Sequence, residues 1–416
     1  MSVKNRVNQA ANAEELMNFL CKFSELLLSW SWEGVSGYEE IIKRISSVYG
    51  HDEIKVNFEA QIANIQLGDT SDFVTVGIPA IPALAHTQLL KDFVCDIEEG
   101  KLTLAEANKN LDKILNKKNP YPPILVWLGV VIISVGFAVD VVGTWQGLLW
   151  AGITATATGL VFLAPDKIPG FDKIAALVAT FASGLIVMLA YKFGLISAAP
   201  GLLLIAATFV FIPGDSISLQ AYELANGKWS AGVDRLFYSI IMLVLQLTGA
   251  YMAVLITGSS MSELFPSAIA DTFPWWAAYP GRFVFVIGIL LTFQMSKKQF
   301  LPALITLWIV TAVAQAATMA WGEIAGTFIA TVIGTILALW QARKPHSIPA
   351  YVLIIPIIFA LSPGSHGLRQ LETWVSGQTI TGINDLNTLL TIMLAIGMGV
   401  VVGRTLGNKM NYFNNF

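Results

Sequence analysis

Apolar residues dominate the chain from Ile124 onward, whereas a mixed pattern of apolar and polar residues precedes them. About 20 apolar residues are needed to span the hydrocarbon of a bilayer as a helix. Ten segments approach that length or are interrupted before they reach it. They cover residues 124–144, 146–163, 174–191, 200–212, 232–257, 282–296, 300–319, 322–341, 349–362 and 380–403. This pattern predicts an α-helical polytopic membrane protein with ten spans.

Residues 1–120 follow a different pattern, which predicts a small α+β domain. Apolar side chains at spacings of three and four indicate helices, and short alternating runs indicate strands. Helices are expected over residues 14–28, 38–49 and 84–98, and strands over residues 53–58 and 61–67, before a turn at Gly68-Asp69. Thr103-Leu-Ala-Glu106 has the form of a capping box and predicts a last helix that runs to Lys117.

The fourth and ninth apolar segments each end in a Pro-Gly pair, in the stretches Ile212-Pro213-Gly214-Asp215-Ser216 and Ser362-Pro363-Gly364-Ser365-His366. The two pairs are 150 residues apart, and the same spacing relates identical residues on both sides of them. Gly184, Leu203, Ile205, Phe209, Gln220, Gly227, Gly232, Leu236 and Gly249 recur as Gly334, Leu353, Ile355, Phe359, Gln370, Gly377, Gly382, Leu386 and Gly399. Repetition in one register indicates a duplicated membrane unit.

Lys and Arg are distributed unevenly between the loops, and cytoplasmic loops normally carry the excess. With residues 1–120 in the cytosol, the inner loops carry Lys117, Lys118, Lys167, Lys173, Lys228, Arg235, Lys297, Lys298, Arg343, Lys344, Arg404 and Lys409, and the outer loops carry Lys192, Arg282 and Arg369. We therefore expect a multi-pass protein of the cell (inner) membrane with its N-terminal domain and C-terminus in the cytoplasm.

Each copy of the duplicated unit holds five spans, and an odd number inverts the second copy relative to the first. The expected organisation has four parts. These are a cytosolic α+β domain over residues 1–120, a first five-span repeat over 121–258, an external loop over 259–281 and a second five-span repeat over 282–416.

The two breaks are predicted to form the substrate site. An interrupted helix frees backbone N–H and C=O groups, which persist at membrane depth only where they line a cavity or are buried in protein. Inverted repeats with broken helices near the midplane are typical of alternating-access transporters. The N–H groups of a helix that restarts after Pro-Gly favour a carboxylate. The candidate substrate-binding residues are Pro213, Gly214, Asp215, Ser216, Pro363, Gly364, Ser365 and His366. A plain N-cap role is an alternative for Asp215 and Ser216.

Four ionisable residues are candidates for proton coupling: Asp215, Asp140, Glu323 and His366. Ionisable groups within a span are costly and usually functional, and His titrates near neutral pH. Asp140 and Glu323 lie near the ends of their segments, so simple solvation is an alternative for both. Buried Gln residues often bridge helices by hydrogen bonds, and this role is expected for Gln246, Gln294 and Gln315.

Composition agrees with a membrane protein, because 55% of the residues are hydrophobic, only 13% are charged and the mean hydropathy is +0.64. Soluble proteins carry about 25% charged residues. A net charge of −3 gives no reason to expect a nucleic-acid partner. The two cysteines and four histidines show no metal-ligand spacing, so neither a disulfide nor a metal site is expected. The first 120 residues contain no phosphate loop and no nucleophile with a paired base, so neither a cofactor nor an enzyme activity is predicted.

Several of these features resemble the threonine/serine exporter (ThrE) family over nearly the whole chain. They are Gly34 after the first helix, the segment Gly100-Lys-Leu-Thr-Leu-Ala-Glu-Ala107, the ten spans, and Pro213-Gly214-Asp215-Ser216 with Gly227 and Gly232 downstream. The Gly100 segment is similar to the family's Gly-x-Leu-Ser/Thr-x-x-Glu-Ala pattern. Members often carry Arg after the first of these glycines, where this chain reads Gly34-Val-Ser-Gly-Tyr-Glu39.

The resemblance implies export of threonine, serine or similar small solutes, driven by the proton motive force, and a cytoplasmic soluble domain. Related members divided into two chains export dicarboxylates such as succinate. Our first hypothesis is a proton-coupled secondary transporter, an antiporter that exports small amino acids by alternating access. The alternatives are an exporter of small dicarboxylates and a membrane-tethered enzyme or sensor that acts through the N-terminal domain. The expected partners are an amino acid or small carboxylate, protons and the lipid bilayer, and a homo-oligomer is left open.

Overall fold

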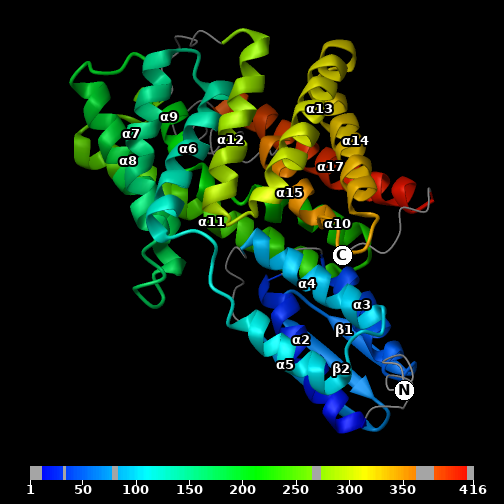
Figure 1. Ribbon diagram of the computed structural model, residues 1–416. Coiled ribbons are helices and arrows are strands. Elements are labelled where there is room, and N and C mark those ends of the chain that lie inside the picture. The colour runs from blue at the N-terminus through cyan, green and yellow to red at the C-terminus, as the bar shows by residue number, and fades with distance from the viewer. Residues whose placement is uncertain (1–11, 31–33, 77–82, 265–272, 362–378, 410–416) are drawn as a thin grey trace.

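Helices account for most of the chain, and one small sheet lies among the first of them (Figure 1). The computed structural model describes residues 12–30, 34–76, 83–264, 273–361 and 379–409. Within these ranges only the backbone is described at residues 30, 36, 215, 217, 218, 379–390, 408 and 409.

The N-terminal unit, described over residues 12–30, 34–76 and 83–115, combines four helices with a three-stranded antiparallel sheet in the order β1-β2-β3. Its elements are α2 (Ala13–Trp30), α3 (Val35–Val48), β1 (Ile54–Phe58), β2 (Ile62–Leu67), β3 (Thr70–Thr75), α4 (Leu84–Glu98) and α5 (Leu104–Leu115). The pattern predicted every one of these elements except β3, which is polar and almost wholly exposed. Strand β3 forms because β2 offers it a free edge, in a register that sets Ile65 opposite Asp72.

The N-terminal unit has a hydrophobic core of its own, in which aromatic rings from different helices meet. Phe19 and Phe23 of α2 both contact Phe93 of α4, with ring centroids 6.3 and 5.8 Å away. The predicted capping box at the start of α5 is confirmed. Thr103 Oγ1 accepts a hydrogen bond from the Glu106 N–H at 3.4 Å, and the Glu106 carboxylate accepts one from the Thr103 N–H at 3.0 Å.

The other described residues form a helix bundle, and the N-terminal unit lies against one end of it (Figure 1). The first half of the bundle contains α6 (Pro123–Val141), α7 (Trp145–Phe162), α8 (Asp172–Lys192), α9 (Pro200–Ala207), η1 (Phe209–Phe211), α10 (Gly214–Ala225) and α11 (Trp229–Thr257). After the short turns η2 (Met261–Glu263) and η3 (Trp275–Ala277), the second half contains α12 (Ala278–Thr292), α13 (Lys297–Trp321), α14 (Glu323–Ala342), α15 (Ala350–Leu361) and α17 (Thr379–Lys409).

All ten predicted apolar segments are helical in the structure, the fourth as α9 followed by η1. Six of the described segments are long and apolar enough to cross a bilayer, namely Pro123–Val141, Asp172–Lys192, Trp229–Thr257, Trp275–Thr292, Lys297–Trp321 and Glu323–Ala342. The chain is therefore a multi-pass membrane protein.

Helices α6 and α12, the first helix of each half, are antiparallel neighbours. At the end beside the N-terminal unit, the Tyr121 N–H donates to Gln294 Oε1 at 2.9 Å. At the opposite end, Arg282 forms an ion pair with Asp140. The start of α6 thus lies beside the end of α12, and the end of α6 lies beside the start of α12.

Two further helix pairs pack in similar ways in the two halves, α8 with α11 and α14 with α17. A Cβ atom added at Gly249 of α11 would lie 2.4 Å from the Leu177 carbonyl oxygen and 3.1 Å from Thr180 Cβ. A Cβ atom added at Gly399 of α17 would lie 3.1 Å from the Phe328 carbonyl oxygen and 2.7 Å from Thr331 Cβ. Each glycine therefore lets two helices approach until a side chain larger than hydrogen no longer fits.

The short helices α9 and α15 lie inside the bundle and are apolar on every side. Almost all of their residues are buried, including Leu203 and Leu353, which are both fully buried. A helix that is hydrophobic all round belongs in a protein interior or in lipid. These two are covered by protein, so the two segments that precede the Pro-Gly pairs occupy the centre of the bundle.

Candidate functional site

The first predicted break is present as a true interruption of the helix. Helix α9 ends at Ala207, the chain makes one turn of 3-10 helix, and α10 begins at Gly214 with Pro213 at its N-cap. The Gly214 N–H donates to the Ile212 carbonyl at 2.8 Å, which tightens the corner. Asp215 and Ser216 are the second and third residues of α10, so the alternative that they are the N-cap is wrong.

Side chains from two neighbouring helices satisfy backbone carbonyl groups at this break. Ser134 of α6 donates to the Ala207 carbonyl at 3.3 Å, and Gln246 of α11 donates to the Phe211 carbonyl at 3.1 Å. The prediction that Gln246 bridges helices is therefore confirmed. Its Oε1 atom is buried and has no hydrogen-bond partner among the described residues. Gln294 and Gln315 also bridge segments, through Tyr121 and Trp275.

The second break, with Pro363, Gly364, Ser365 and His366, lies outside the described residues. The residues that lead into both breaks can be compared, and they meet. Phe209 precedes Pro213 by four residues and Phe359 precedes Pro363 by four residues. Their ring centroids are 5.9 Å apart in an edge-to-face arrangement. Two identical residues at the same place in the two repeated stretches are thus in direct contact.

Three further rings complete a buried aromatic cluster around this contact. Phe137 of α6 and Phe285 of α12 lie 4.4 and 5.4 Å from Phe209, and Phe293 stacks on Phe359 at 5.2 Å. The cluster joins both halves of the bundle through α6, η1, α12 and α15.

The N-terminus of α10 provides the chemistry at the first break. The first N–H groups of a helix have no partner within the helix, and they carry the positive end of its dipole. Ser216, in the first turn, is buried. A buried hydroxyl beside a helix N-terminus suits a carboxylate group of a small ligand.

The two other described candidates for proton coupling lie in different places. Asp140, in the last turn of α6, pairs with the buried Arg282 of α12. Glu323 is the first residue of α14 and is exposed. The role of both residues in proton coupling stays a prediction.

Sequence reasoning missed Glu223, which is fully buried in the last turn of α10. Its Oε1 atom accepts a hydrogen bond from the Val35 N–H at the start of α3, at 3.0 Å, and lies 3.9 Å from Arg235. Burial raises the pKa of Glu223, while Arg235, the Val35 N–H and the more distant Arg404 and Lys228 act in the opposite direction. The residue is one of two acids, with Asp215, in a mixed helix, and that was the signal available in the sequence.

The contact between Glu223 and α3 requires glycine at position 34. Gly34 has φ +92°, a conformation that other residues rarely adopt, and an added Cβ would lie 3.0 Å from Glu223 Oε1. Two more polar contacts hold the same side of the N-terminal unit, namely an ion pair between Glu39 and Lys228 and a hydrogen bond from Ser230 to Glu59 at 3.3 Å. We call this group of contacts the Glu223 junction.

A second junction, formed by α4, attaches the N-terminal unit to the other half of the bundle. The first N–H groups of α4, from Leu84 and Ala85, donate to the carbonyl groups of Phe293 and Gln294, directly after the end of α12, over 2.8 and 3.0 Å. Buried Lys91 donates to the Ala342 carbonyl at the end of α14 at 2.8 Å. We call this group of contacts the α4 junction, in which the first N–H groups of α4 find acceptors just beyond the end of α12.

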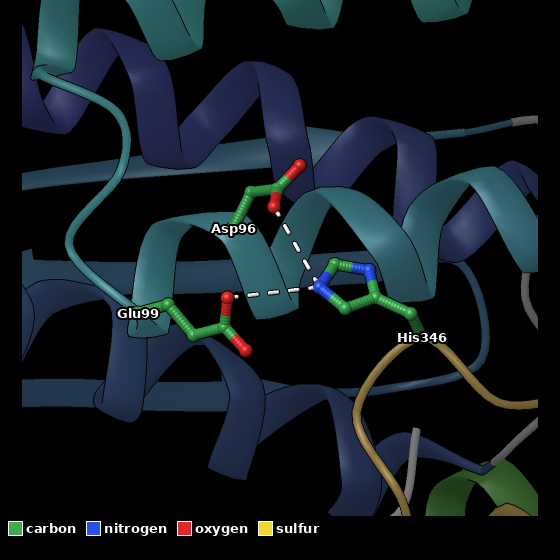
Figure 2. Close-up of side chains that lie close together, drawn as sticks. All are labelled: Asp96, Glu99 and His346. Atoms are coloured by element: carbon green, nitrogen blue, oxygen red, sulfur yellow. Dashed lines mark ion pairs between the residues drawn. The ribbon is translucent and has the colours of Figure 1, made fainter.

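One cluster of possible metal ligands lies at the edge of the α4 junction, formed by Asp96, Glu99 and His346 (Figure 2). His346 Nε2 lies 3.7 Å from an oxygen of each carboxylate. Lys101 Nζ already contacts Asp96 at 3.0 Å and Glu99 at 2.5 Å. We interpret the cluster as a partly exposed ion-pair network between α4 and the loop after α14. A cavity of about 500 Å³ opens beside it, lined among others by Gln88, Lys298 and Lys344.

Comparison with known proteins supports the resemblance seen in the sequence. Residues 19–257 match the profile of the ThrE family, described as threonine/serine exporters. The match runs from α2 to the end of α11 and therefore includes the N-terminal unit, the first break and Glu223. No curated protein and no solved structure matches the chain at a significant level. Because the matched region covers more than half of the 416 residues, the chain belongs to the threonine/serine exporter (ThrE) family.

Proposed function

We propose that this protein exports threonine, serine or similar small amino acids by alternating access between the two interrupted segments. The transporter family to which the chain belongs supports the general function. In the proposed arrangement, ten spans form two inverted five-span repeats. The N-terminal unit and the C-terminus lie in the cytoplasm, and the Asp140 end of α6 faces outward.

The contact between Phe209 and Phe359 is the observation that carries the proposal. A transport path between two breaks requires the segments that lead into them to converge inside the protein. Both short helices are buried, and the two rings touch across the halves of the bundle. Two breaks at opposite surfaces with packed helices between them would have argued against a common site.

The direction of the helices supports inverted repeats. Inversion requires the first helix of each unit to run opposite to the other, and α6 and α12 are antiparallel. The similar packing at Gly249 and Gly399, which are 150 residues apart, agrees with a repeated helix pair. Inverted repeats around a central site are the arrangement in which one half rocks against the other.

In this proposal the substrate carboxylate lies near the N–H groups after Gly214, with Ser216 as a further donor. Pro363, Gly364, Ser365 and His366 would contribute the matching groups of the second break. Asp215, the second residue of α10, is the first candidate for carrying the proton, with Asp140, Glu323 and His366 as further candidates. Asp140 is the least suited of these to a separate role at the breaks because it is paired with Arg282.

The purified protein in liposomes should exchange labelled threonine and serine and should accumulate them when a pH gradient is imposed. Counterflow measures the exchange directly, and the same vesicles can be offered labelled succinate. Clear transport of succinate without transport of either amino acid would contradict the amino-acid proposal and favour the dicarboxylate alternative. Empty liposomes serve as the control for leakage.

The Asp215→Asn variant should lose accumulation driven by the pH gradient while it retains measurable exchange, because the amide cannot take up and release a proton. The initial rate of threonine accumulation, with and without the gradient, measures this loss. Wild-type protein and a variant at an exposed carboxylate of the N-terminal unit, Glu53→Gln, provide the comparison. A response of Asp215→Asn to the gradient as large as that of the wild type would remove Asp215 from the mechanism.

A further inference from the structure

The cavity beside the α4 junction lies where two spans end on the same side of the membrane. Its volume is about 500 Å³, within the range of roughly 300–1,000 Å³ that is usual for ligand pockets. The span Lys297–Trp321 begins at this cavity and the span Glu323–Ala342 ends there, while α4 contributes Gln88 and Asp92 to the lining. Trp340, in the last turn of α14, is exposed, as is common for Trp at a membrane interface. The cavity therefore opens at the level of the lipid headgroups.

Cations outnumber carboxylates in the lining of this cavity. Lys298 in the first turn of α13 lines it, as do Arg343 and Lys344 directly after α14. Among the described residues Asp92 is the one carboxylate of the lining, and it faces His346, whose Nδ1 lies 3.4 Å from its oxygen. The Nζ atoms of Lys298 and Lys344 form no hydrogen bond or ion pair within the described part of the chain. The charges of two lysines that share one cavity are therefore available to a ligand.

The other polar groups of the wall are bonded to one another. Gln299 Nε2 donates to Gln88 Oε1 at 3.4 Å, and Gln88 Nε2 donates to the Ser347 carbonyl at 3.1 Å. The guanidinium of Arg343 lies over the ring of Trp340, 4.9 Å from its centroid. These contacts join α4, α13 and the loop after α14, so that all three segments surround the same space.

We propose that this cavity binds a phosphate group, and we assign that phosphate to the headgroup of an anionic phospholipid. Lys298, Arg343 and Lys344 attract an anion, and the N–H groups at the start of α13 add the positive end of a helix dipole, which suits phosphate. Basic pockets between spans on the cytoplasmic side are typical sites for anionic headgroups. A lipid held here contacts both α4 and the second half of the bundle, and so strengthens the α4 junction. The site is separate from the two breaks and does not depend on the proposed transport.

Binding of lipid to the full chain in a neutral detergent tests the site. Protein stripped of lipid is titrated with short-chain phosphatidylglycerol, with phosphatidylcholine of the same chain length, and with inorganic phosphate. Native mass spectrometry counts the bound lipid, and the unfolding temperature of the same samples reports stabilisation by a ligand that binds the folded state. Phosphatidylglycerol should bind more tightly than phosphatidylcholine, whose positive choline group the lysines repel. Inorganic phosphate should raise the unfolding temperature only at much higher concentration.

Two pairs of substitutions separate the cavity from the general charge of this membrane side. Lys298→Gln with Lys344→Gln should weaken the binding of phosphatidylglycerol on the order of fivefold for each lysine, and Lys298→Arg with Lys344→Arg should restore it. Both side chains are exposed, so the protein should fold in each case. Lys167→Gln with Lys173→Gln removes the same charge from exposed positions beside the start of α8 and should have little effect.

Equal affinity for the two lipids would overturn the site. Equal losses in the cavity pair and in the pair beside α8 would do the same, because they would show attraction to the whole surface rather than to the cavity. Inorganic phosphate that stabilises the protein as well as phosphatidylglycerol at equal concentration would overturn the lipid assignment in favour of a soluble phosphate. A loss confined to the cavity pair, with the unfolding temperature unchanged in the absence of lipid, would support the proposal.

Discussion

The Glu223→Ala variant should lose most of the Glu223 junction, at a cost of about 3 kcal/mol in the free energy of unfolding. Removing one partner of a buried charge arrangement is strongly destabilising, because the other groups remain buried without compensation. Here the Val35 N–H loses its acceptor and Arg235 loses its buried partner. Hydrogen exchange at the first amides of α3, together with thermal unfolding in detergent, measures the loss.

Two matched variants separate the charge of Glu223 from its role as an acceptor. Glu223→Gln keeps an oxygen for the Val35 N–H and should cost less than Glu223→Ala. Glu53→Ala removes an exposed carboxylate from the same unit and should stay within about 0.5 kcal/mol of the wild type. Unchanged protection of the α3 amides in Glu223→Ala would show that the junction does not hold the N-terminal unit.

Replacing Phe209 with alanine should be still more damaging, because its ring contacts Phe137, Phe285 and Phe359 at the centre of the bundle. Truncation of a buried Phe to Ala typically costs about 3–5 kcal/mol. We also expect exchange of threonine to fall sharply, since the break would lose the contact that joins it to the second repeated stretch. Thermal unfolding and counterflow on the same preparation measure both effects.

A double-mutant cycle with Phe359→Ala tests whether the two rings act together. A coupling of about 0.5–1.5 kcal/mol is expected for an aromatic pair of this kind. Phe237→Ala, at an exposed position on α11, is the matched control and should change the unfolding temperature little. Additive effects of Phe209→Ala and Phe359→Ala would contradict an energetic coupling between the two segments that lead into the breaks.

The positions of the helices could be predicted because they depend on local patterns. Apolar runs identified ten of the described helical segments of the bundle, all except α10, and the capping box at Thr103 and Glu106 fixed the start of α5. Strand β3 was missed because Ser71 and Asp72 are unfavourable in strands and its side chains are exposed. Pairing with β2 outweighs that weak preference, and such pairing is not visible in a single segment.

The contacts at the candidate sites were only partly predictable. The repeated spacing brought Phe209 and Phe359 to attention as equivalent residues, and the structure shows them in contact. The partners of Glu223 and Lys91 are about 190 and 250 positions away in the chain, and no periodicity relates them. Arg282 was counted as a loop charge, because composition near the end of an apolar segment does not reveal burial against Thr311 and Asp140.

The two junctions of the N-terminal unit have a consequence for motion. The Glu223 junction attaches this unit to the first half of the bundle, and the α4 junction attaches it to the second. The unit therefore connects the two halves of the bundle, which an alternating-access cycle would move relative to each other. Such a movement would require the N-terminal unit to bend or one of its two junctions to open. The α4 junction combines two backbone hydrogen bonds with buried Lys91, whereas the Glu223 junction depends on one carboxylate, one ion pair and one further hydrogen bond. The Glu223 junction is the weaker of the two, so the N-terminal unit would move together with the second half of the bundle.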